Sequence, residues 1–377
     1  MTLAPLKDIA TVVMGLSPKG EFVTTEDGKG VPLLNGPTEF GSVSPSARQW
    51  TSHSPRMAEP GDILFCVRGS TTGKMNRAQM PYAIGRGIAA IRGADDVDTR
   101  VIYYSLVERL HVLLSLTSGS VFPNLSSDDI RNFEIEWPEK GERAAIAATL
   151  GALDDKIESN RRAVEKGEAL IRTLVGRTLN ASNAAEGTLG DYCALVKSTA
   201  KPKFISADEN YIGFEHMPRG SVFLDDWAPA GELGSNKSRF ERGDILFGKL
   251  RPYFKKVGIA PIDGVCSTDI LVVRPVVSRD RALVACVAAS DALIDSLSAA
   301  STGTRMPRAS WKDLAAWPVP LLSITEREQL AASVDPMISR LENLIAESHR
   351  LASLRDALLP ELLSGRIRAT AEELVSA

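Results

Sequence analysis

Two glycine-containing segments have residue types that could hold a phosphate group. Gly69-Ser-Thr-Thr-Gly73-Lys74 places three residues between its glycines, whereas a nucleotide-binding phosphate loop needs four. Met75 also stands where that loop needs a Ser or Thr to bind magnesium. Gly85-Arg-Gly87 lacks the third glycine of a dinucleotide-binding fingerprint. These segments therefore predict neither a nucleotide site nor a dinucleotide cofactor.

The cysteines and histidines are scattered, without the spacing of a metal site or a catalytic cluster. They are Cys66, Cys193, Cys266 and Cys286, and His53, His111, His216 and His349. Four cysteines without a pairing pattern are typical of buried thiols in a reducing cytosol. The sequence also lacks a signal-peptide pattern and an apolar run long enough to span a membrane. We expect a cytoplasmic, non-catalytic protein with no metal, no cofactor and no membrane contact.

Positive charge is concentrated in two stretches, although the net charge of the chain is −3. Residues 66–93 carry five basic residues and no acidic residue. Residues 235–260 carry seven basic and two acidic residues. A solvated charged loop is the plain interpretation of one such stretch. Two such stretches at matched places in the chain would favour a surface that faces phosphate groups.

The sequence contains an internal repeat of two copies. Gly-Asp-Ile-Leu-Phe occurs at residues 61–65 and again at 243–247, and both basic stretches lie at or around this motif. Three other pairs recur at almost the same separation: Trp137-Pro138 and Trp317-Pro318, Ser118-Gly119-Ser120 and Thr302-Gly303-Thr304, and Glu142-Arg143 and Glu326-Arg327. Each copy is a globular half followed by a long helical stretch. The two basic stretches therefore occupy the same position in the two copies.

The apolar patterns predict a mixed α/β fold for each half. Expected strands are Ile63–Val67, Ile88–Ile91, Phe133–Trp137, Ile245–Leu250, Val257–Ala260 and Ile270–Val273. Expected helices are Asp98–Leu116, capped by Asp98, and Arg279–Leu297. Residues 15–60 are rich in Gly, Pro, Ser and Thr and should be loops. We expect domains at residues 1–140 and 184–323, and helical spacers at 141–183 and 324–377.

Each spacer carries apolar residues at the alternating spacing of a coiled-coil seam. The first seam is Ile146, Leu150, Leu153, Ile157, Asn160, Val164, Gly167, Ile171 and Leu174. The second is Leu330, Val334, Met337, Leu341, Leu344, Ser348, Leu351, Arg355 and Leu358. The fold class is therefore α+β, with two tandem α/β domains and an antiparallel coiled coil with a pseudo-two-fold axis. The alternative is two surface helices, each on its own domain.

Details of the seams lead to two further expectations. Gly151 and the Asp335-Pro336 pair fall at the same place in the two spacers, which predicts a short helix, a kink and then a helix of about 25 residues. Asn160 is a polar residue at a core position. It either fixes the register of the helix pair or lies at a solvated midpoint. Because the first spacer leads into the second half, the C-terminus should return to the first half.

Three segments resemble the DNA-specificity subunits of type I restriction–modification systems. Residues 61–74, with Gly61-Asp-Ile-Leu-Phe-Cys-Val-Arg68-Gly-Ser70, are similar to a glycine-rich stretch of that family's target-recognition domains. Ser118-Gly-Ser-Val-Phe-Pro123-Asn124-Leu125-Ser126 is similar to the segment that closes such a domain. Leu358-Leu-Pro-Glu-Leu-Leu-Ser364-Gly365-Arg-Ile367 resembles the family's helix ending.

The resemblance implies a non-catalytic subunit that reads a bipartite, asymmetric site on double-stranded DNA. Its helices would dock two methyltransferase subunits, which carry S-adenosylmethionine, and a translocase–nuclease subunit could join them. The second half departs from the motif, with Lys249-Leu250-Arg251-Pro252 in place of the Arg-Gly-Ser step, so the halves should read different bases. A methylation-only or phage-defence complex, a coiled-coil scaffold without a DNA role and a stand-alone enzyme are the alternatives.

Basic residues near the repeated motif are the expected DNA contacts, most of them to phosphates. The candidates are Arg68, Ser70, Lys74, Arg77, Arg86, Lys237, Lys249, Arg251, Lys255, Lys256 and Arg305. Arg68, Arg251 and Arg305 are the candidates for contact with bases.

Overall fold

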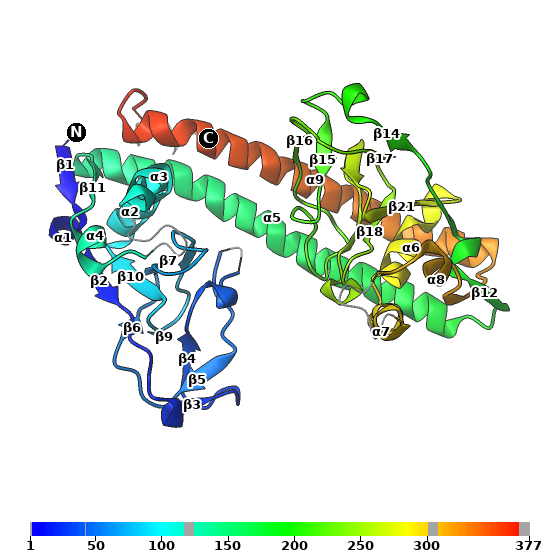
Figure 1. Ribbon diagram of the computed structural model, residues 1–377, viewed down its shortest axis with the longest axis horizontal. Helices are drawn as coiled ribbons and strands as arrows, with labels where there is room; N and C mark the ends of the chain where they lie inside the picture. Colours follow the sequence, from blue (N-terminus) through cyan, green and yellow to red (C-terminus); the bar gives the residue numbers. More distant parts are fainter. Residues whose placement is uncertain (1, 42, 117–123, 301–307, 369–377) are drawn as a thin grey trace. The chain divides into compact units, whose positions relative to one another are not determined.

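The chain forms two compact units in a computed structural model that describes residues 2–41, 43–116, 124–300 and 308–368 (Figure 1). Unit 1 is Met1–Glu158 with Arg350–Ala377, and unit 2 is Ser159–His349. Helices α5 (Lys140–Ala181) and α9 (Ile324–Leu363) each contribute residues to both units. Both ends of the chain therefore belong to unit 1, as the expected return of the C-terminus requires.

The described residues of unit 1 form three β-sheets with the strand orders β1-β11, β2-β10-β7-β8 and β3-β5-β4-β9-β6. The strands are β1 (Thr2–Pro5), β2 (Thr11–Met14), β3 (Val23–Thr24), β4 (Val31–Leu34), β5 (Gln49–Thr51), β6 (Met57–Ala58), β7 (Ile63–Cys66), β8 (Met75–Arg77), β9 (Tyr82–Ile84), β10 (Ile88–Arg92) and β11 (Glu134–Trp137). Its shorter helices are α1 (Leu6–Ile9), α2 (Asp96–Glu108), α3 (Leu110–Ser115) and α4 (Ser127–Arg131), with 3-10 turns at Gly20–Phe22 and Pro37–Glu39.

In the part of unit 2 that the structure describes there are also three sheets, with the orders β12-β22, β13-β21-β18-β19 and β14-β17-β20-β15-β16. The strands are β12 (Glu186–Thr188), β13 (Cys193–Leu195), β14 (Thr199–Ala200), β15 (Asn210–Ile212), β16 (Ala228–Pro229), β17 (Lys237–Phe240), β18 (Ile245–Gly248), β19 (Val257–Ile259), β20 (Gly264–Ser267), β21 (Ile270–Pro275) and β22 (Pro318–Pro320). Its shorter helices are α6 (Arg281–Ala288), α7 (Asp291–Ala300) and α8 (Trp311–Ala315), with 3-10 turns η3 (Leu189–Asp191), η4 (Pro202–Phe204), η5 (Pro252–Phe254) and η6 (Ser278–Asp280).

The sheets show that the sequence repeat is a repeat of topology. The order β2-β10-β7-β8 in unit 1 has the same connectivity as β13-β21-β18-β19 in unit 2. The Ile-Leu-Phe part of the repeated motif forms β7 and β18, an inner strand of each of these sheets, and is completely buried in both copies. The repeated residues are therefore the centre of each core. The α/β expectation for both halves is confirmed, and so are the six expected strands, to within a few residues.

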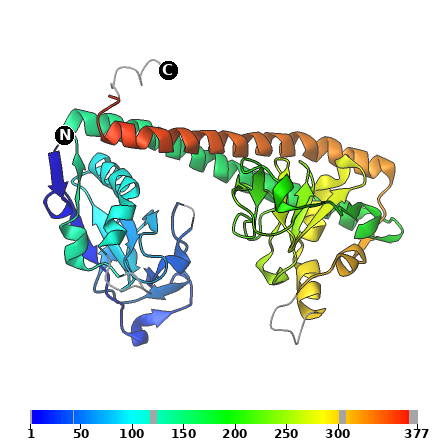
Figure 2. The same cartoon turned by 45° about the horizontal axis from the view of Figure 1, so that its top comes forward.

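In each unit the two long helices pack in antiparallel directions and lie side by side in both views (Figures 1 and 2). In unit 1, Arg355 binds Asp154 at 2.8 Å and Arg368 lies 3.8 Å from Glu142. From the first of these contacts to the second, the residue number falls on α5 while it rises along α9 and the residues that follow it, so the two helices run in opposite directions. In unit 2, Asn160 lies against Leu344 and Ser348, and Gly167 lies against Leu341.

A buried ion pair fixes the start of each long helix to its own unit. Arg143 Nε donates to Asp98 Oδ1 at 2.7 Å in unit 1, and Arg327 Nε donates to Asp280 Oδ1 at 2.8 Å in unit 2. Both arginines belong to the repeated Glu-Arg pair. Each long helix therefore packs on its own α/β layer as well as on the other helix. The helix pair and the alternative of two helices that each lie on their own domain thus occur together.

Four local expectations are wrong. Residues 15–60 contain strands β3 to β6, because pairing with β9 rather than apolar periodicity decides their structure. Asp95, not Asp98, caps α2, which leaves Asp98 free to bind Arg143. The expected helix Arg279–Leu297 is divided into η6, α6 and α7. The long helices are not interrupted at Gly151 or Pro336, because their packed faces hold the helix through these residues.

No single described helix is long and apolar enough to cross a membrane, although the bent pair Ser278–Ala288 and Asp291–Ala299 passes by length and composition. Within the same residues, no group of three or more His, Cys, Asp or Glu side chains could hold a metal ion.

Candidate nucleic-acid interface

The repeated motif begins with the same turn in both units. Gly61 and Gly243 have φ angles of 92° and 89°, a region that glycine adopts without steric cost. Their N–H groups donate to the carbonyl groups of Ala78 and Ala260, at 2.8 and 2.9 Å. The turn brings the chain into the buried strand β7 or β18, and thereby fixes where that strand begins.

The aspartate of the motif accepts a two-point hydrogen bond from an arginine on a neighbouring strand. Arg92 binds Asp62 at 2.5 and 2.9 Å, and Arg274 binds Asp244 at 2.7 and 2.8 Å. Both carboxylates are nearly inaccessible, with 1% and 2% of their surface exposed. The hydrogen bond from each arginine to its aspartate raises the arginine's pKa. These pairs are structural, because both partners are already satisfied.

In unit 1 the strand is followed by a glycine-rich loop, residues 67–74, which we call loop 1. Gly69 and Gly73 have φ angles of 88° and 93°, and the Gly73 N–H donates to Cys66 O at 2.9 Å. The Leu125 N–H donates to Val67 O at 3.0 Å, so loop 1 lies against the segment that precedes α4. Ser70 is exposed on this loop.

In unit 2 the corresponding loop, residues 249–256, is called loop 2. The Ala309 N–H donates to Lys249 O at 2.9 Å, so this loop lies against the segment that precedes α8, as loop 1 does at α4. Its backbone is different, because Arg251 and Lys255 both have a φ angle of 50°. That region costs a residue with a Cβ atom about 1–2 kcal/mol. The framework is repeated, whereas the exposed loop is not.

Five of the candidate cations have no acidic partner within ion-pair distance among the described residues. They are Arg68, Lys74, Arg86, Lys249 and Arg251. Lys249 is half-buried and the other four are exposed. Two lie on loop 1 and two on loop 2, and Arg86 precedes β10 of the same sheet. A free cation on the surface is available to an anion from outside the chain.

Four other candidates already have partners. Arg77 pairs with Asp96, and Lys255 pairs with Asp291 at 2.7 Å, which lowers the pKa of Asp291. Lys256 donates to Phe214 O, and burial followed by the charge of Arg219 lowers its pKa. Lys237 is 7% exposed and donates to Ser235 at 2.8 Å. Arg305 lies outside the described residues, together with both Ser/Thr-Gly-Ser/Thr segments.

The structure adds two residues that the charge count missed, Tyr253 on loop 2 and Arg219, which packs against that loop. Tyr253 is 50% exposed at its tip. The guanidinium of Arg219 lies over the ring of Phe254, 4.2 Å from its centroid, and Tyr253 packs edge-on against the same ring at 4.8 Å. Aromatic residues interleaved with basic ones in residues 235–260 were the available signal for Tyr253. Arg219 lies outside that stretch, so nothing in the spacing indicates it.

The seam residues lie where the long helices contact each other and their units. Ile146 and Leu150 are buried in a cluster with Leu359, Leu362 and Leu363. The seam residues that are buried in, or packed against, the unit 2 core are Val164, Ile171, Leu174, Leu330, Val334, Met337, Leu341 and Leu344. Leu153, Ile157, Leu351, Arg355 and Leu358 are half-buried.

Asn160 is the most buried polar residue of the helix pair in unit 2, with 2% of its surface exposed. Its Nδ2 donates to Glu347 Oε2 at 2.8 Å, Ser348 Oγ at 3.3 Å and Leu344 O at 3.5 Å. Of the two expectations, the solvated midpoint is wrong. The buried amide has specific partners on α9, the geometry that a register-fixing residue requires.

Residues 2–166 match the family described as "Type I restriction modification DNA specificity domain". The EcoDI specificity subunit of the Escherichia coli type I restriction enzyme is 22% identical over 372 residues, covering 85% of this chain and 80% of that protein. The chain is therefore similar to type I restriction–modification DNA specificity subunits, in its first half by the family match and over most of its length by the EcoDI subunit.

Two further similar proteins differ in the share of this chain that they match. A protein of Methanocaldococcus jannaschii, named as the MjaX type I restriction enzyme specificity subunit, is 34% identical over 168 residues. That match spans 44% of this chain and 39% of the relative, less than half of either. The crystal structure of the type I S subunit from M. genitalium has a TM-score of 0.58 at 18% identity, over 96% and 95% of the two chains. This likeness shows the shared fold.

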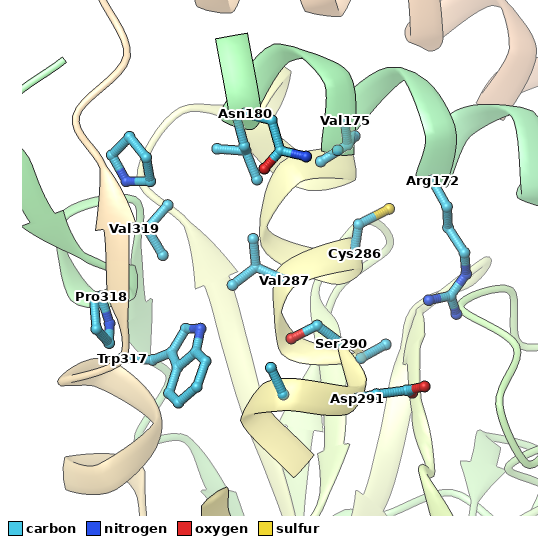
Figure 3. Close-up of a pocket in the computed structure, with 15 residues that line it drawn as sticks. Arg172, Val175, Asn180, Cys286, Val287, Ser290, Asp291, Trp317, Pro318 and Val319 are labelled. Atoms are coloured by element: carbon cyan, nitrogen blue, oxygen red, sulfur yellow. The ribbon is translucent and has the colours of Figure 1, made fainter. Parts of the chain in front are cut away.

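A cavity of about 520 Å³ lies in unit 2, between α5, α6, α7 and β22 (Figure 3). Val175, Val287, Trp317 and Val319 line its apolar part. Burial raises the pKa of the Cys286 thiol to about 12, so the thiol stays protonated at neutral pH. Because a nucleophilic cysteine needs a lowered pKa, this thiol is unsuited to that role.

Proposed function

We propose that the chain is a non-catalytic subunit that reads two different half-sites of one DNA site with its two α/β units. Loop 1 and loop 2 would face the duplex, and each would contribute to one half of an interrupted, asymmetric sequence. The observation that carries this proposal is the repeated framework. The same strand, ion pair and turn present an exposed loop with unpaired cations in each unit, and the loops themselves differ.

Charge and geometry assign the contacts within each loop. Lys74 and Lys249 would neutralise phosphates, because a lysine ammonium is a point charge without the geometry to discriminate bases. Arg68 and Arg251 have the planar two-point donors that suit the acceptor edge of guanine in the major groove. Arg77, Lys237, Lys255 and Lys256 would shape the surface instead, because their charges are already bound within the chain.

The long helices would dock two methyltransferase subunits, which bind S-adenosylmethionine and modify the target adenine. The support is an exposed leucine at the same place of each repeat: Leu170 on α5 is 50% exposed and Leu354 on α9 is 48% exposed. Two matching apolar sites suit two copies of one partner. A translocase–nuclease subunit would join through these methyltransferases. The expected cytoplasmic location follows from this function.

Methylation sequencing tests the proposal directly. The chain would be co-expressed with the methyltransferase encoded beside it, and methylated adenines would then be located across the host genome. We expect a two-part motif with a fixed gap and unequal halves. Methylation of a short continuous palindrome would contradict the two-unit reading. If the complex binds duplex DNA no better than the methyltransferase alone, the chain is a scaffold instead.

A further inference from the structure

The loop 2 backbone holds an exposed aromatic residue in place. Tyr253 lies in the 3-10 turn η5, with Arg251 on one side and Lys255 on the other. Among the described residues, these two are the non-glycine residues with a positive φ angle. A backbone of this kind persists only when its surroundings hold it, and such residues concentrate at binding and catalytic sites.

The contacts around loop 2 supply that support. The Lys255 N–H donates to Pro252 O at 2.8 Å, Lys255 O accepts from the Gly220 N–H at 3.0 Å, and the Lys255 ammonium binds Asp291 at 2.7 Å. The Lys256 ammonium donates to Phe214 O. The two lysines therefore brace the base of the loop, and Tyr253 and Arg251 remain on its outer side.

We propose that Tyr253 makes an aromatic contact with a base of the half-site read by unit 2. This inference rests on the proposed DNA-recognition function and assigns one specificity-determining residue to it. The ring of Tyr253 is 50% exposed on the same loop as Lys249 and Arg251, which have no acidic partner among the described residues. Cations that bind the backbone and an aromatic face that contacts a base are the two components of nucleic-acid grooves.

Unit 1 has no tyrosine at this position. Loop 1 has Ser70, Thr71 and Thr72 between its two positive-φ glycines, so its tip is small and polar. Hydroxyl and backbone groups would read that half-site by hydrogen bonds, whereas unit 2 would use a ring and a guanidinium. The two halves of the motif would then differ in the chemistry of recognition, in addition to their sequence.

The test uses the full chain in complex with its methyltransferase partner and a short duplex that carries the methylated motif. Tyr253→Ala should lower affinity for this duplex by roughly 5- to 150-fold, the range for loss of one base–aromatic stack. Tyr253→Phe keeps the ring and should bind like the wild type. Tyr253→Gln keeps the reach of the side chain without its aromatic face and should fail like Tyr253→Ala. Phe204→Ala, at another exposed aromatic of unit 2, is the matched control.

A fluorescent base distinguishes the two kinds of aromatic contact. With 2-aminopurine placed in turn along the second half-site, wild type and Tyr253→Phe should raise the fluorescence at one position if the ring unstacks a base. An unchanged signal together with the affinity loss would assign the contact to a base edge, such as a thymine methyl group.

The outcomes separate this inference from the proposed function. If the wild-type complex binds the motif and both Tyr253→Ala and Tyr253→Gln bind it equally well, the assignment of Tyr253 is wrong while DNA recognition stands. If the wild-type complex does not distinguish the motif from a scrambled duplex, the proposed function itself fails. Thermal melting of each variant separates a local loss of contact from unfolding.

Discussion

Asp62 and Asp244 show how a single residue can serve the core of each unit and the loop beside it. Each carboxylate accepts a hydrogen bond at 2.8 Å from the backbone N–H three positions upstream, that of Glu59 or Glu241. Each also binds an arginine that enters from the next strand. The aspartate therefore holds the turn before β7 or β18 and ties it to β10 or β21, the neighbouring strand in the same sheet.

Replacing either aspartate by alanine should destabilise its unit by about 2–4 kcal/mol, because an arginine and a backbone N–H lose a buried partner together. The partial exposure of Arg92 and Arg274 keeps this below the cost of a fully buried pair. Urea denaturation followed by circular dichroism measures the change in the free energy of unfolding. Asp27→Ala, at an exposed aspartate of unit 1, is the control and should leave stability unchanged. Equal stability of Asp62→Ala and the control would show that the ion pair contributes nothing.

The surface residues show what a sequence can and cannot indicate at this scale. Charge counting found both basic stretches, and the repeat placed them at the same point of each half. Charge counting could not distinguish Lys249, which has no acidic partner among the described residues, from Lys255, which has one. The partner of Lys255, Asp291, is distant in sequence and contacts it only in the folded chain. Burial of Lys237 is likewise a property of the sheet β14-β17-β20 and not of its neighbours in the chain.

At the scale of elements, the helix pair carries specific contacts that set its register. Gly167 on α5 faces Leu341 on α9, and a Cβ atom at Gly167 would lie 2.7 Å from Leu341 Cδ2. The side-chain amide of Asn160 on α5 donates to three acceptors on α9. A shift of one helix along the other would bury the asparagine against leucines and remove the space that Leu341 fills. The pairing is therefore specified at particular layers as well as by the apolar seam.

Gly167→Ala should destabilise the chain by about 1–3 kcal/mol, because the added methyl group overpacks a contact whose leucine is 5% exposed. This loss should exceed the gain in helix propensity, which is at most about 1 kcal/mol. Gly176→Ala is the matched control on the same helix, because a Cβ atom there meets nothing within 4 Å, and it should stabilise the chain. Adding Leu341→Ala should relieve the clash in a double-mutant cycle measured by thermal unfolding. Equal effects of the two glycine substitutions would contradict the close contact.

The elements that could be predicted from the sequence are those whose own apolar periodicity determines their secondary structure. The seams predicted both long helices, since a period of three and four residues persists along each of them. The same reasoning failed for β3 to β6, which are two to four residues long and exist because β9 pairs with two of them. It also placed a break at Pro336, where a proline would end an isolated helix but a packed helix continues through it.

At the scale of the whole molecule, duplication gives one repeated framework two separate exposed loops, loop 1 and loop 2. Each unit has its own core, its own ion-paired turn and its own loop, so a change in one loop leaves the other unit's contacts intact. If each loop reads one half-site, the effects of mutations should divide between the halves of the methylated motif. A single continuous reading surface would not divide in this way.

Removing the free cations of one loop should therefore relax one half of the motif. Arg68→Gln with Lys74→Gln should broaden the bases accepted in one half-site, and Lys249→Gln with Arg251→Gln should broaden the other. Loss of an arginine that contacts a base pair costs about 1–3 kcal/mol of discrimination, whereas loss of a phosphate contact weakens binding to all sequences alike. The measurement is the frequency of each base at each position of the methylated sites, determined by sequencing.

The partnered cations supply the control for this experiment. Arg77→Gln in unit 1 and Lys255→Gln in unit 2 remove the same charge from groups that already bind Asp96 and Asp291, so the motif should keep its sequence. Lys255→Gln should instead lower the stability of loop 2. If either double variant degrades both halves equally, the units do not read separate half-sites, and the duplicated framework would then serve one shared surface.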